Sequence, residues 1–125
     1  MLHNPRVALL RSFSYACAGL AYLLRTQRNF RIELGIGALA VVAGVWLRIG
    51  EMEWLALVLT IALVLILEAV NTAIERAVDL ASPGPDPRAK AAKDVSAAAV
   101  LIAAAASLAV GWVIFWPRLM MVLGR

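Results

Sequence analysis

The sequence predicts an all-α integral membrane protein with three transmembrane helices and an amphipathic surface helix at its N-terminal end. Of its 125 residues, 63% are apolar and the mean hydropathy is +0.85, whereas soluble domains are about half apolar. A bilayer core needs roughly 20 apolar residues per helix, and three stretches meet that need: residues 32–49, 52 to about 77, and 95 to about 117. We therefore expect a single membrane-embedded domain over residues 1–125.

Residues 5–28 carry two stripes at helical spacing, one apolar and one more polar. This pattern predicts an amphipathic helix lying on the cytoplasmic membrane surface, with a fourth short span as the alternative. Arginines within the segment disfavour that alternative. Residues 26–31 would form the bend into the first span. The apolar stripe holds Leu10, Phe13, Cys17, Leu20 and Leu24; the polar stripe holds Arg11, Tyr15, Ala18, Tyr22 and Arg25.

The ends of the later helices carry capping signals. The second spanning helix, residues 52–80, should start after Gly50, because Glu51 and Glu53 suit the positive end of a helix dipole. It should stop at the Ser-Pro-Gly-Pro run of residues 82–85. Asp86 followed by Pro87 resembles an N-cap and first helical position, which predicts a third spanning helix over residues 87–118.

The distribution of charge predicts an orientation. Basic residues gather before the first span and between the second and third, so the positive-inside rule places residues 1–31 and 81–93 in the cytoplasm and the C-terminus outside. The tryptophans agree, because all occur at span ends assigned to the outer side, where an interfacial belt is expected. They are Trp46, Trp54, Trp112 and Trp116.

The net charge of +4 does not form one dense basic patch, so an anionic membrane surface or anionic substrate fits it better than nucleic acid. Cys17 is the only cysteine, which excludes an intrachain disulfide and a multi-cysteine metal site. His3, the only histidine, is given no role.

A polar stripe interrupts the second apolar stretch. Glu68, Asn71, Glu75 and Asp79 follow the uncharged run 54–67 at spacings of i, i+3, i+7 and i+11. At about 100° per residue they share roughly an 80° arc of one helix face. Carboxylates at a membrane boundary are costly unless they are hydrated, neutralised or paired, so the stripe points to function.

The start of the third spanning helix brings Lys90, Lys93 and Asp94 to the same depth. Lysine neutralises phosphate, whereas Glu75 and Asp94 offer the oxygen ligands that Mg²⁺ prefers. These groups suggest phosphoryl transfer to a lipid hydroxyl, with one carboxylate accepting its proton. The sequence contains neither a P-loop nor a kinase-type glycine loop. For Lys90 a purely topogenic charge is the favoured interpretation, and Asp79 fits a solvated helix end equally well.

Several motifs together resemble the prokaryotic diacylglycerol kinase family, which includes the undecaprenol kinases. They are the run Glu68-Ala-Val-Asn-Thr-Ala-Ile-Glu75, then Asp79, then Ala92-Lys93-Asp94 followed by Ala97-Ala-Ala-Val-Leu101. The amphipathic start, with Ser12-Phe-x-Tyr15-Ala-x-x-Gly19-Leu, and the bend Arg28-Asn-Phe-Arg31 extend the similarity over nearly the whole chain.

The resemblance implies a homotrimer of the bacterial cytoplasmic membrane that uses Mg²⁺ and ATP to phosphorylate a membrane lipid alcohol. It implies that Glu68 is the general base, that Asn71 positions the base or substrate, and that Glu75 binds magnesium. Lys93 and Asp94 would contact the ATP phosphates and their surroundings, with Lys90 and Asp79 on the nucleotide side. One departure is Gln27, where the family commonly has a metal-binding glutamate; an amide oxygen is still a ligand but carries no charge.

The lipid acceptor stays open. Diacylglycerol, giving phosphatidic acid, is the first expectation and undecaprenol, giving undecaprenyl phosphate, is the alternative. Glu33 is equally compatible with a substrate or metal contact and with an interfacial role beside Arg31. A small membrane transporter is a remoter alternative, because its coupling carboxylate should lie near the bilayer midplane. A non-catalytic assembly subunit would leave the acidic face unexplained.

Overall fold

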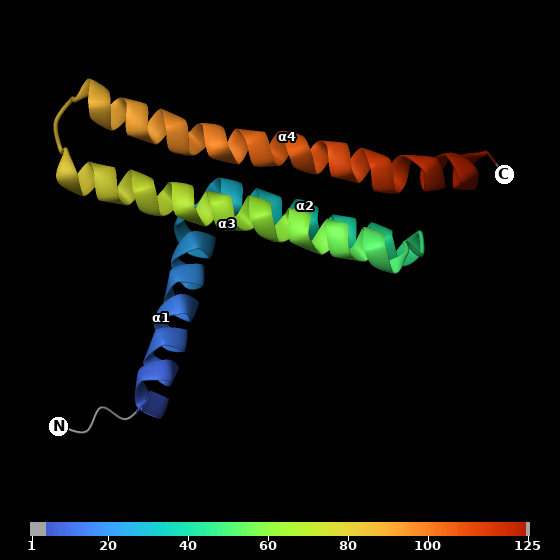
Figure 1. Ribbon diagram of the computed structural model, residues 1–125, viewed down its shortest axis with the longest axis horizontal. Helices are drawn as coiled ribbons and strands as arrows, with labels where there is room; N and C mark the ends of the chain where they lie inside the picture. The colour runs from blue at the N-terminus through green and yellow to red at the C-terminus, as the bar shows by residue number, and fades with distance from the viewer. Residues whose placement is uncertain (1–4, 125) are drawn as a thin grey trace.

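The computed structural model describes residues 5–124, which form four helices and no strand. These are α1 (Pro5–Thr26), α2 (Arg28–Trp46), α3 (Glu51–Ala81) and α4 (Pro87–Leu123). Helices α3 and α4 lie side by side in a long antiparallel hairpin, α2 packs along part of α3, and α1 lies crosswise to the others (Figure 1). We call the end of the hairpin at residues 82–86 the loop end, and the end at residues 47–50 the turn end. The predicted all-α class is confirmed; His3 lies outside the described residues.

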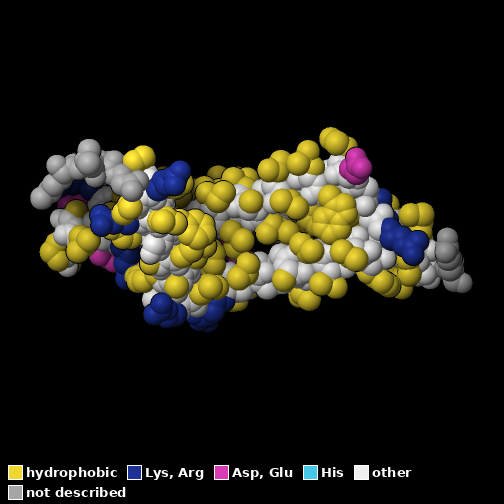
Figure 2. All heavy atoms as spheres, turned by 90° about the horizontal axis from the view of Figure 1, so that it is seen from below, with side chains coloured by type: hydrophobic (Ala, Val, Ile, Leu, Met, Phe, Trp, Pro, Cys, Tyr) yellow, Lys and Arg dark blue, Asp and Glu magenta, His cyan; other side chains and the backbone are white. Residues whose placement is uncertain are grey.

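The surface is that of a membrane protein. All four helices are long and apolar enough to cross a bilayer. The accessible area is 9481 Å², against about 6,500 Å² for a compact soluble monomer of this mass. Figure 2 shows hydrophobic side chains covering the middle of one face, with basic side chains gathered toward the ends. Lipid or further protein must therefore cover the apolar middle.

The break between α1 and α2 is shorter than predicted. A bend over residues 26–31 and a span starting at 32 were expected, but only Gln27 leaves helical geometry (φ −107°, ψ 107°). The Arg31 guanidinium donates to the carbonyls of Leu24 at 2.9 Å and Arg25 at 3.2 Å. Since these hydrogen bonds satisfy the last carbonyls of α1, α2 can begin at once.

At the turn end, α2 stops at Trp46 rather than at residue 49. The Ile49 amide donates to the Gly44 carbonyl at 3.1 Å and the Arg48 amide donates to the Val45 carbonyl at 3.3 Å. This is a Schellman motif, and Arg48 occupies its left-handed position with φ 53°. The next helix starts after Gly50 as predicted, with the Glu53 carboxylate accepting from the Gly50 amide at 2.8 Å.

The apolar core also lies near the turn end. Ile49, Leu57 and Ile114 form its buried centre. The Arg118 guanidinium forms an ion pair with Glu53 and so ties α4 to the start of α3. Helix α4 was expected to end at 118 but runs to Leu123 through Pro117. The Arg118 guanidinium also donates to the Ile114 carbonyl of its own helix at 3.4 Å.

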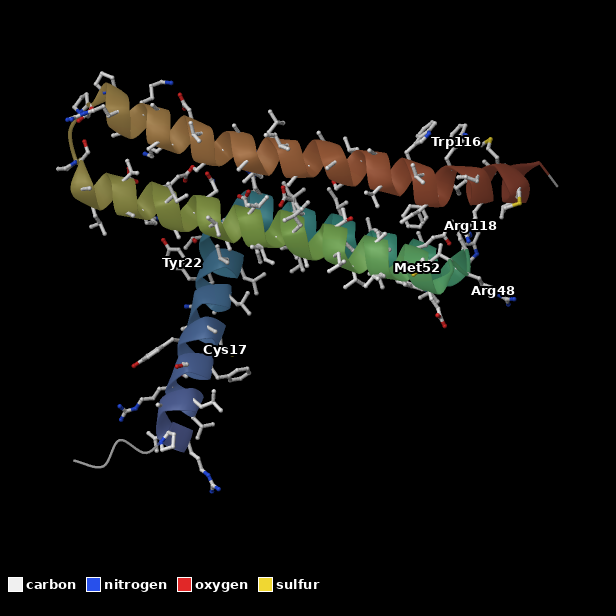
Figure 3. All side chains as sticks on the ribbon, viewed as in Figure 1. Cys17, Tyr22, Arg48, Met52, Trp116 and Arg118 are labelled. Atoms are coloured by element: carbon white, nitrogen blue, oxygen red, sulfur yellow. The ribbon has the colours of Figure 1, made fainter. Side chains whose placement is uncertain are left out.

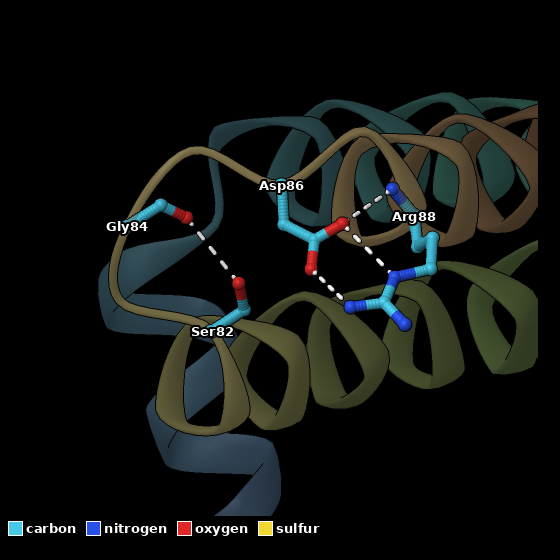
Figure 4. Close-up of polar contacts among 4 residues, drawn as sticks. All are labelled: Ser82, Gly84, Asp86 and Arg88. Atoms are coloured by element: carbon cyan, nitrogen blue, oxygen red, sulfur yellow. Dashed lines mark hydrogen bonds and ion pairs between the residues drawn. The ribbon is translucent and has the colours of Figure 1, made fainter.

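The loop end has the predicted caps (Figure 4). Helix α3 ends at Ala81, and the Ser82 hydroxyl donates to the Gly84 carbonyl at 3.3 Å. Asp86 is the N-cap of α4 and accepts from the Arg88 amide at 2.8 Å. The Arg88 guanidinium also pairs with the Asp86 carboxylate at 2.9 Å. The connection is therefore short and capped on both sides.

Candidate active site

The polar stripe of α3 passes from a buried to an exposed environment along its length. Glu68 is 4% exposed and Asn71 is 9% exposed, Glu75 is half-buried, and Asp79 is exposed. The Glu68 carboxylate accepts no hydrogen bond from any residue in the range 5–124, although its backbone carbonyl accepts from the Thr72 hydroxyl at 2.9 Å. A buried carboxylate that no cation neutralises is unusual, and it leaves Glu68 open to a proton-bearing ligand.

A hydrogen-bonded chain joins this stripe to α4. The Ser96 hydroxyl donates to the Asn71 side-chain oxygen at 2.6 Å, and the Asn71 amide group donates to Glu75 at 3.3 Å. Asn71 is thus held between the two helices with a defined orientation. The sequence-based site did not include Ser96. Its signal was a small polar residue three positions after Lys93 in an otherwise alanine-rich helix.

Lys93 also crosses from α4 to α3. Its ammonium donates to the Asp79 carboxylate at 2.6 Å, while both side chains keep substantial exposure, 39% and 52%. Lys93 and Asp94 were both expected to contact the nucleotide beside the stripe, but Asp94 pairs instead with Lys90, one turn earlier on the exposed side of α4. The structure therefore brings Lys93 to the stripe, whereas Lys90 and Asp94 form a separate exposed pair.

The end of α1 approaches the same part of α3. The Arg76 guanidinium lies 6.0 Å from the centre of the Tyr22 ring, and Figure 3 shows Tyr22 at the end of α1 that meets α3. Gln27 follows a few residues later, and its amide donates to the Thr26 hydroxyl at 3.0 Å. Gln27 thus occupies the break between α1 and α2, as the N-cap residue of α2.

Glu33 faces the stripe from α2. One of its carboxylate oxygens is buried and has no hydrogen-bond partner among the described residues. Its carboxylate also interacts electrostatically with that of Glu68. Of the two interpretations left open by the sequence, this placement favours a contact with substrate or metal over an interfacial role.

An apolar groove begins beside Glu33 and runs between α2, α3 and α4. Its volume is about 760 Å³, and nearly all of its lining is hydrophobic. Toward the turn end it reaches Trp112 and Trp116, whose rings stack with centroids 4.4 Å apart. A carboxylate at one end of a long apolar groove suits an amphiphile with a small polar head.

The residues present fit a Mg²⁺ ion that is held jointly by the protein and the phosphates of a substrate, rather than one held by the protein alone. Within the described residues, no group of three or more His, Cys, Asp or Glu side chains is arranged to hold a metal. Mg²⁺ is usually bound by one or two carboxylates together with substrate phosphates, so a full protein cage is not required. Glu75 suits that role, because its one side-chain hydrogen bond within residues 5–124 is the 3.3 Å contact from Asn71. Asp79 and Asp94, in contrast, are each paired with a lysine.

Fold and site together define a small helical membrane protein with a buried carboxylate, a polar network and a lysine at one end of a helical hairpin. Residues 14–115 match the family described as prokaryotic diacylglycerol kinase. The chain belongs to this family, as its motifs predicted.

Individual relatives cover most of the chain. A diacylglycerol kinase of Synechocystis is 44% identical over 113 residues, which are 90% of this chain and 65% of that protein. The chain thus spans just under two thirds of that relative's length. An undecaprenol kinase of Bacillus subtilis is 38% identical over 93% of this chain and 94% of its own. A diacylglycerol kinase of Escherichia coli is 31% identical over 86% of this chain and 88% of its own.

Proposed function

We propose that the protein is a lipid kinase that transfers the γ-phosphoryl group of ATP to the hydroxyl group of a membrane lipid alcohol. The observation that carries this function is the unpaired, buried Glu68 carboxylate, one turn from the Ser96–Asn71–Glu75 chain. Membership of the prokaryotic diacylglycerol kinase family supports it. The names of the cyanobacterial and Bacillus relatives, which are both lipid alcohol kinases, support it further.

Glu68 acts as the general base. The acceptor oxygen attacks the γ-phosphorus, its proton passes to the Glu68 carboxylate, and the bond to the bridging oxygen of ADP breaks. A base at this position must not be neutralised by a cation, and none of the residues 5–124 pairs with Glu68. Asn71, fixed by Ser96, positions the groups beside the base.

The nucleotide binds on the exposed side of the same stripe. Lys93 neutralises phosphate charge once it exchanges Asp79 for a phosphate oxygen, and the Lys90–Asp94 pair borders this region. Glu75 would hold Mg²⁺ together with the phosphates, with the uncharged Gln27 as a weaker second ligand. When bound, the metal supplies positive charge that offsets charge on the phosphates.

The apolar groove beside Glu33 holds the lipid chain and directs the polar head toward Glu68. Diacylglycerol, giving phosphatidic acid, is the first candidate acceptor, because the 44% identical Synechocystis relative bears that name. Undecaprenol is the second candidate, because the Bacillus undecaprenol kinase aligns with this chain over 94% of its length.

In the membrane, α2, α3 and α4 span the bilayer while α1 lies on the cytoplasmic surface, an arrangement supported by the crosswise position of α1 (Figure 1). The N-terminus and the active site are then cytoplasmic and the C-terminus is outside, in a multi-pass protein of the bacterial inner membrane. Three helices per chain do not enclose both ATP and a lipid, so the chain forms an oligomer, a homotrimer by family resemblance.

The test is a transfer assay with the purified chain in lipid, γ-labelled ATP, and either diacylglycerol or undecaprenol supplied side by side. We expect label to enter one lipid at least tenfold faster than the other, and chelation of Mg²⁺ to stop the transfer. Failure to label either lipid in a folded, oligomeric sample would contradict a lipid kinase. Transfer that survives complete chelation would exclude the role given to Glu75.

A further inference from the structure

A second cavity lies at the turn end, far along the hairpin from the candidate active site. Its volume is about 430 Å³, and it is bordered by two arginines, Arg48 and Arg118. Figure 3 shows both arginines at this end, Arg48 on the α2–α3 turn and Arg118 on α4 beside it. The remaining lining is apolar: Trp46, Leu47, Met121 and Val122. The cavity thus combines two guanidinium groups with an apolar wall.

Arg48 is an unfavourable residue for its backbone position. The left-handed position of a Schellman motif normally holds glycine, because a side chain there meets steric resistance, yet Arg48 adopts φ 53°. The side chain does not offset this strain, because within residues 5–124 it forms neither a hydrogen bond nor an ion pair. A strained residue whose side chain is unused by the chain itself points to an outside ligand.

Arg118 is held in a fixed position beside it. Its guanidinium pairs with Glu53, and the side chain is 25% exposed. The contacts of Arg118 with Glu53 and with the Ile114 carbonyl both use the same terminal nitrogen. Since a guanidinium has five N–H donors, the others stay available for a second anion.

We propose that this cavity binds the phosphate group of an anionic phospholipid, with Arg48 and Arg118 as its donors. Guanidinium groups match phosphate oxygens in shape and charge. The apolar wall suits the glycerol and upper chain of a lipid better than a free ion. Trp46 on the wall and the nearby Trp112–Trp116 stack are typical of the headgroup region, where such a phosphate lies. This lipid is a bound ligand whose phosphate lies at the opposite end of the bundle from the polar head of the acceptor.

The test compares the purified full chain in neutral detergent with added phosphatidylglycerol, phosphatidylcholine or inorganic phosphate. Thermal unfolding and native mass spectrometry would give the stabilisation and the number of retained lipids. We expect phosphatidylglycerol alone to raise the melting temperature and to remain bound. Arg48→Gln should weaken that binding roughly tenfold, as expected for one charge-assisted contact. Equal stabilisation by inorganic phosphate would overturn the assignment to a lipid.

Two further variants separate a site from general surface charge. Arg48→Gly should raise the melting temperature in phosphatidylcholine, because it relieves the left-handed strain, and should lose the increment due to phosphatidylglycerol. Arg88→Gln, an equal charge change at the loop end, should keep that increment. If Arg88→Gln loses as much as Arg48→Gln, or if Arg48→Gly keeps the full increment, the cavity is not the site.

Discussion

The two ends of the α3–α4 hairpin differ in the polarity of their buried side chains. Toward the turn end the buried residues are apolar, with Ile49, Leu57 and Ile114 at the centre. In the half nearer the loop, four of the buried side chains are polar or charged, and two of them are hydrogen-bonded to each other across α3 and α4. They are Glu68, Asn71, Thr72 and Ser96.

Along one pair of helices, the turn end thus contributes mainly to stability, and the end near the loop carries the candidate active site. Apolar side chains at the turn end are stabilised by burial and close packing alone and need no hydrogen-bond partner. Burying a polar group near the loop costs free energy unless the group is hydrogen-bonded, and the Glu68 carboxylate and one oxygen of Glu33 lack such a bond among the described residues. Substitutions at the turn end should therefore change stability alone, whereas substitutions near the loop should also change kcat.

The largest effect is expected from Glu68→Gln. The amide keeps the size of the side chain but cannot accept the proton of an alcohol, so kcat should fall by about 10²- to 10⁴-fold with little change in the melting temperature. Initial rates of phosphate transfer to the lipid would measure this. Activity within a factor of two of the wild type would exclude Glu68 as the base.

Ser96→Ala should have the next largest effect. It removes the 2.6 Å hydrogen bond to Asn71, which would lower kcat roughly 10- to 100-fold through misplacement of that amide. The unfolding free energy should fall by about 1–3 kcal/mol, because a buried acceptor loses its donor. Ser107→Ala is the matched control, since that hydroxyl bonds only the Ala104 carbonyl of its own helix. Equal losses in both variants would contradict a special role for Ser96.

Gly44→Val tests the turn end. A Cβ atom at Gly44 would lie 2.9 Å from a ring carbon of Trp54 and 3.0 Å from the Ile49 side chain. Overpacking should lower the unfolding free energy by about 1–3 kcal/mol while leaving kcat per folded molecule unchanged. Gly35→Val has open space within 4 Å in the single chain and should not be destabilised. Chemical denaturation and active-site-normalised rates would separate the two quantities.

The smallest effect concerns pH and Asp86. Hydrogen bonds from the Arg88 side chain and amide hold the pKa of the Asp86 carboxyl below its ordinary value of 3.8. A group with a lowered pKa stabilises the fold above its unfolded pKa and loses that contribution as the pH falls through the folded value. The melting temperature should thus be lower for Asp86→Ala than for the wild type at neutral pH, and the two should converge below about pH 4. Melting curves measured from pH 7 to pH 3 would show this; a constant difference at every pH would contradict it.

Local chemistry made much of the fold predictable. The start of α3 after Gly50, its stop at Ser82 and the Asp86 N-cap all rest on interactions within a few residues. The placement of Glu68, Asn71, Glu75 and Asp79 on one continuous helix followed from helix periodicity alone. The early start of α2 was missed, because the guanidinium of Arg31 reaches back to carbonyls six and seven residues earlier.

The pairing across the hairpin was less predictable. Whether Lys93 or Lys90 meets Asp79 depends on how α4 is rotated about its axis against α3, which neither helix determines by itself. The same rotation buries Ser96 opposite Asn71. In an alanine-rich helix few large apolar side chains mark the face that packs, so the rotation could not be derived from the sequence.

The capped loop at residues 82–86 is the reference point from which paired residues on α3 and α4 are spaced. Asp79 and Lys93 are 14 positions apart, and Asn71 and Ser96 are 25 apart, so both pairs straddle the same short connection. One residue inserted in α4 between Pro87 and Lys93 would turn Lys93 and Ser96 together by about 100° relative to the N-cap and take both pairs out of phase. The alignment of the candidate site across the hairpin thus depends on the number of residues between the Asp86 N-cap and Lys93, none of which belongs to that site except Lys90.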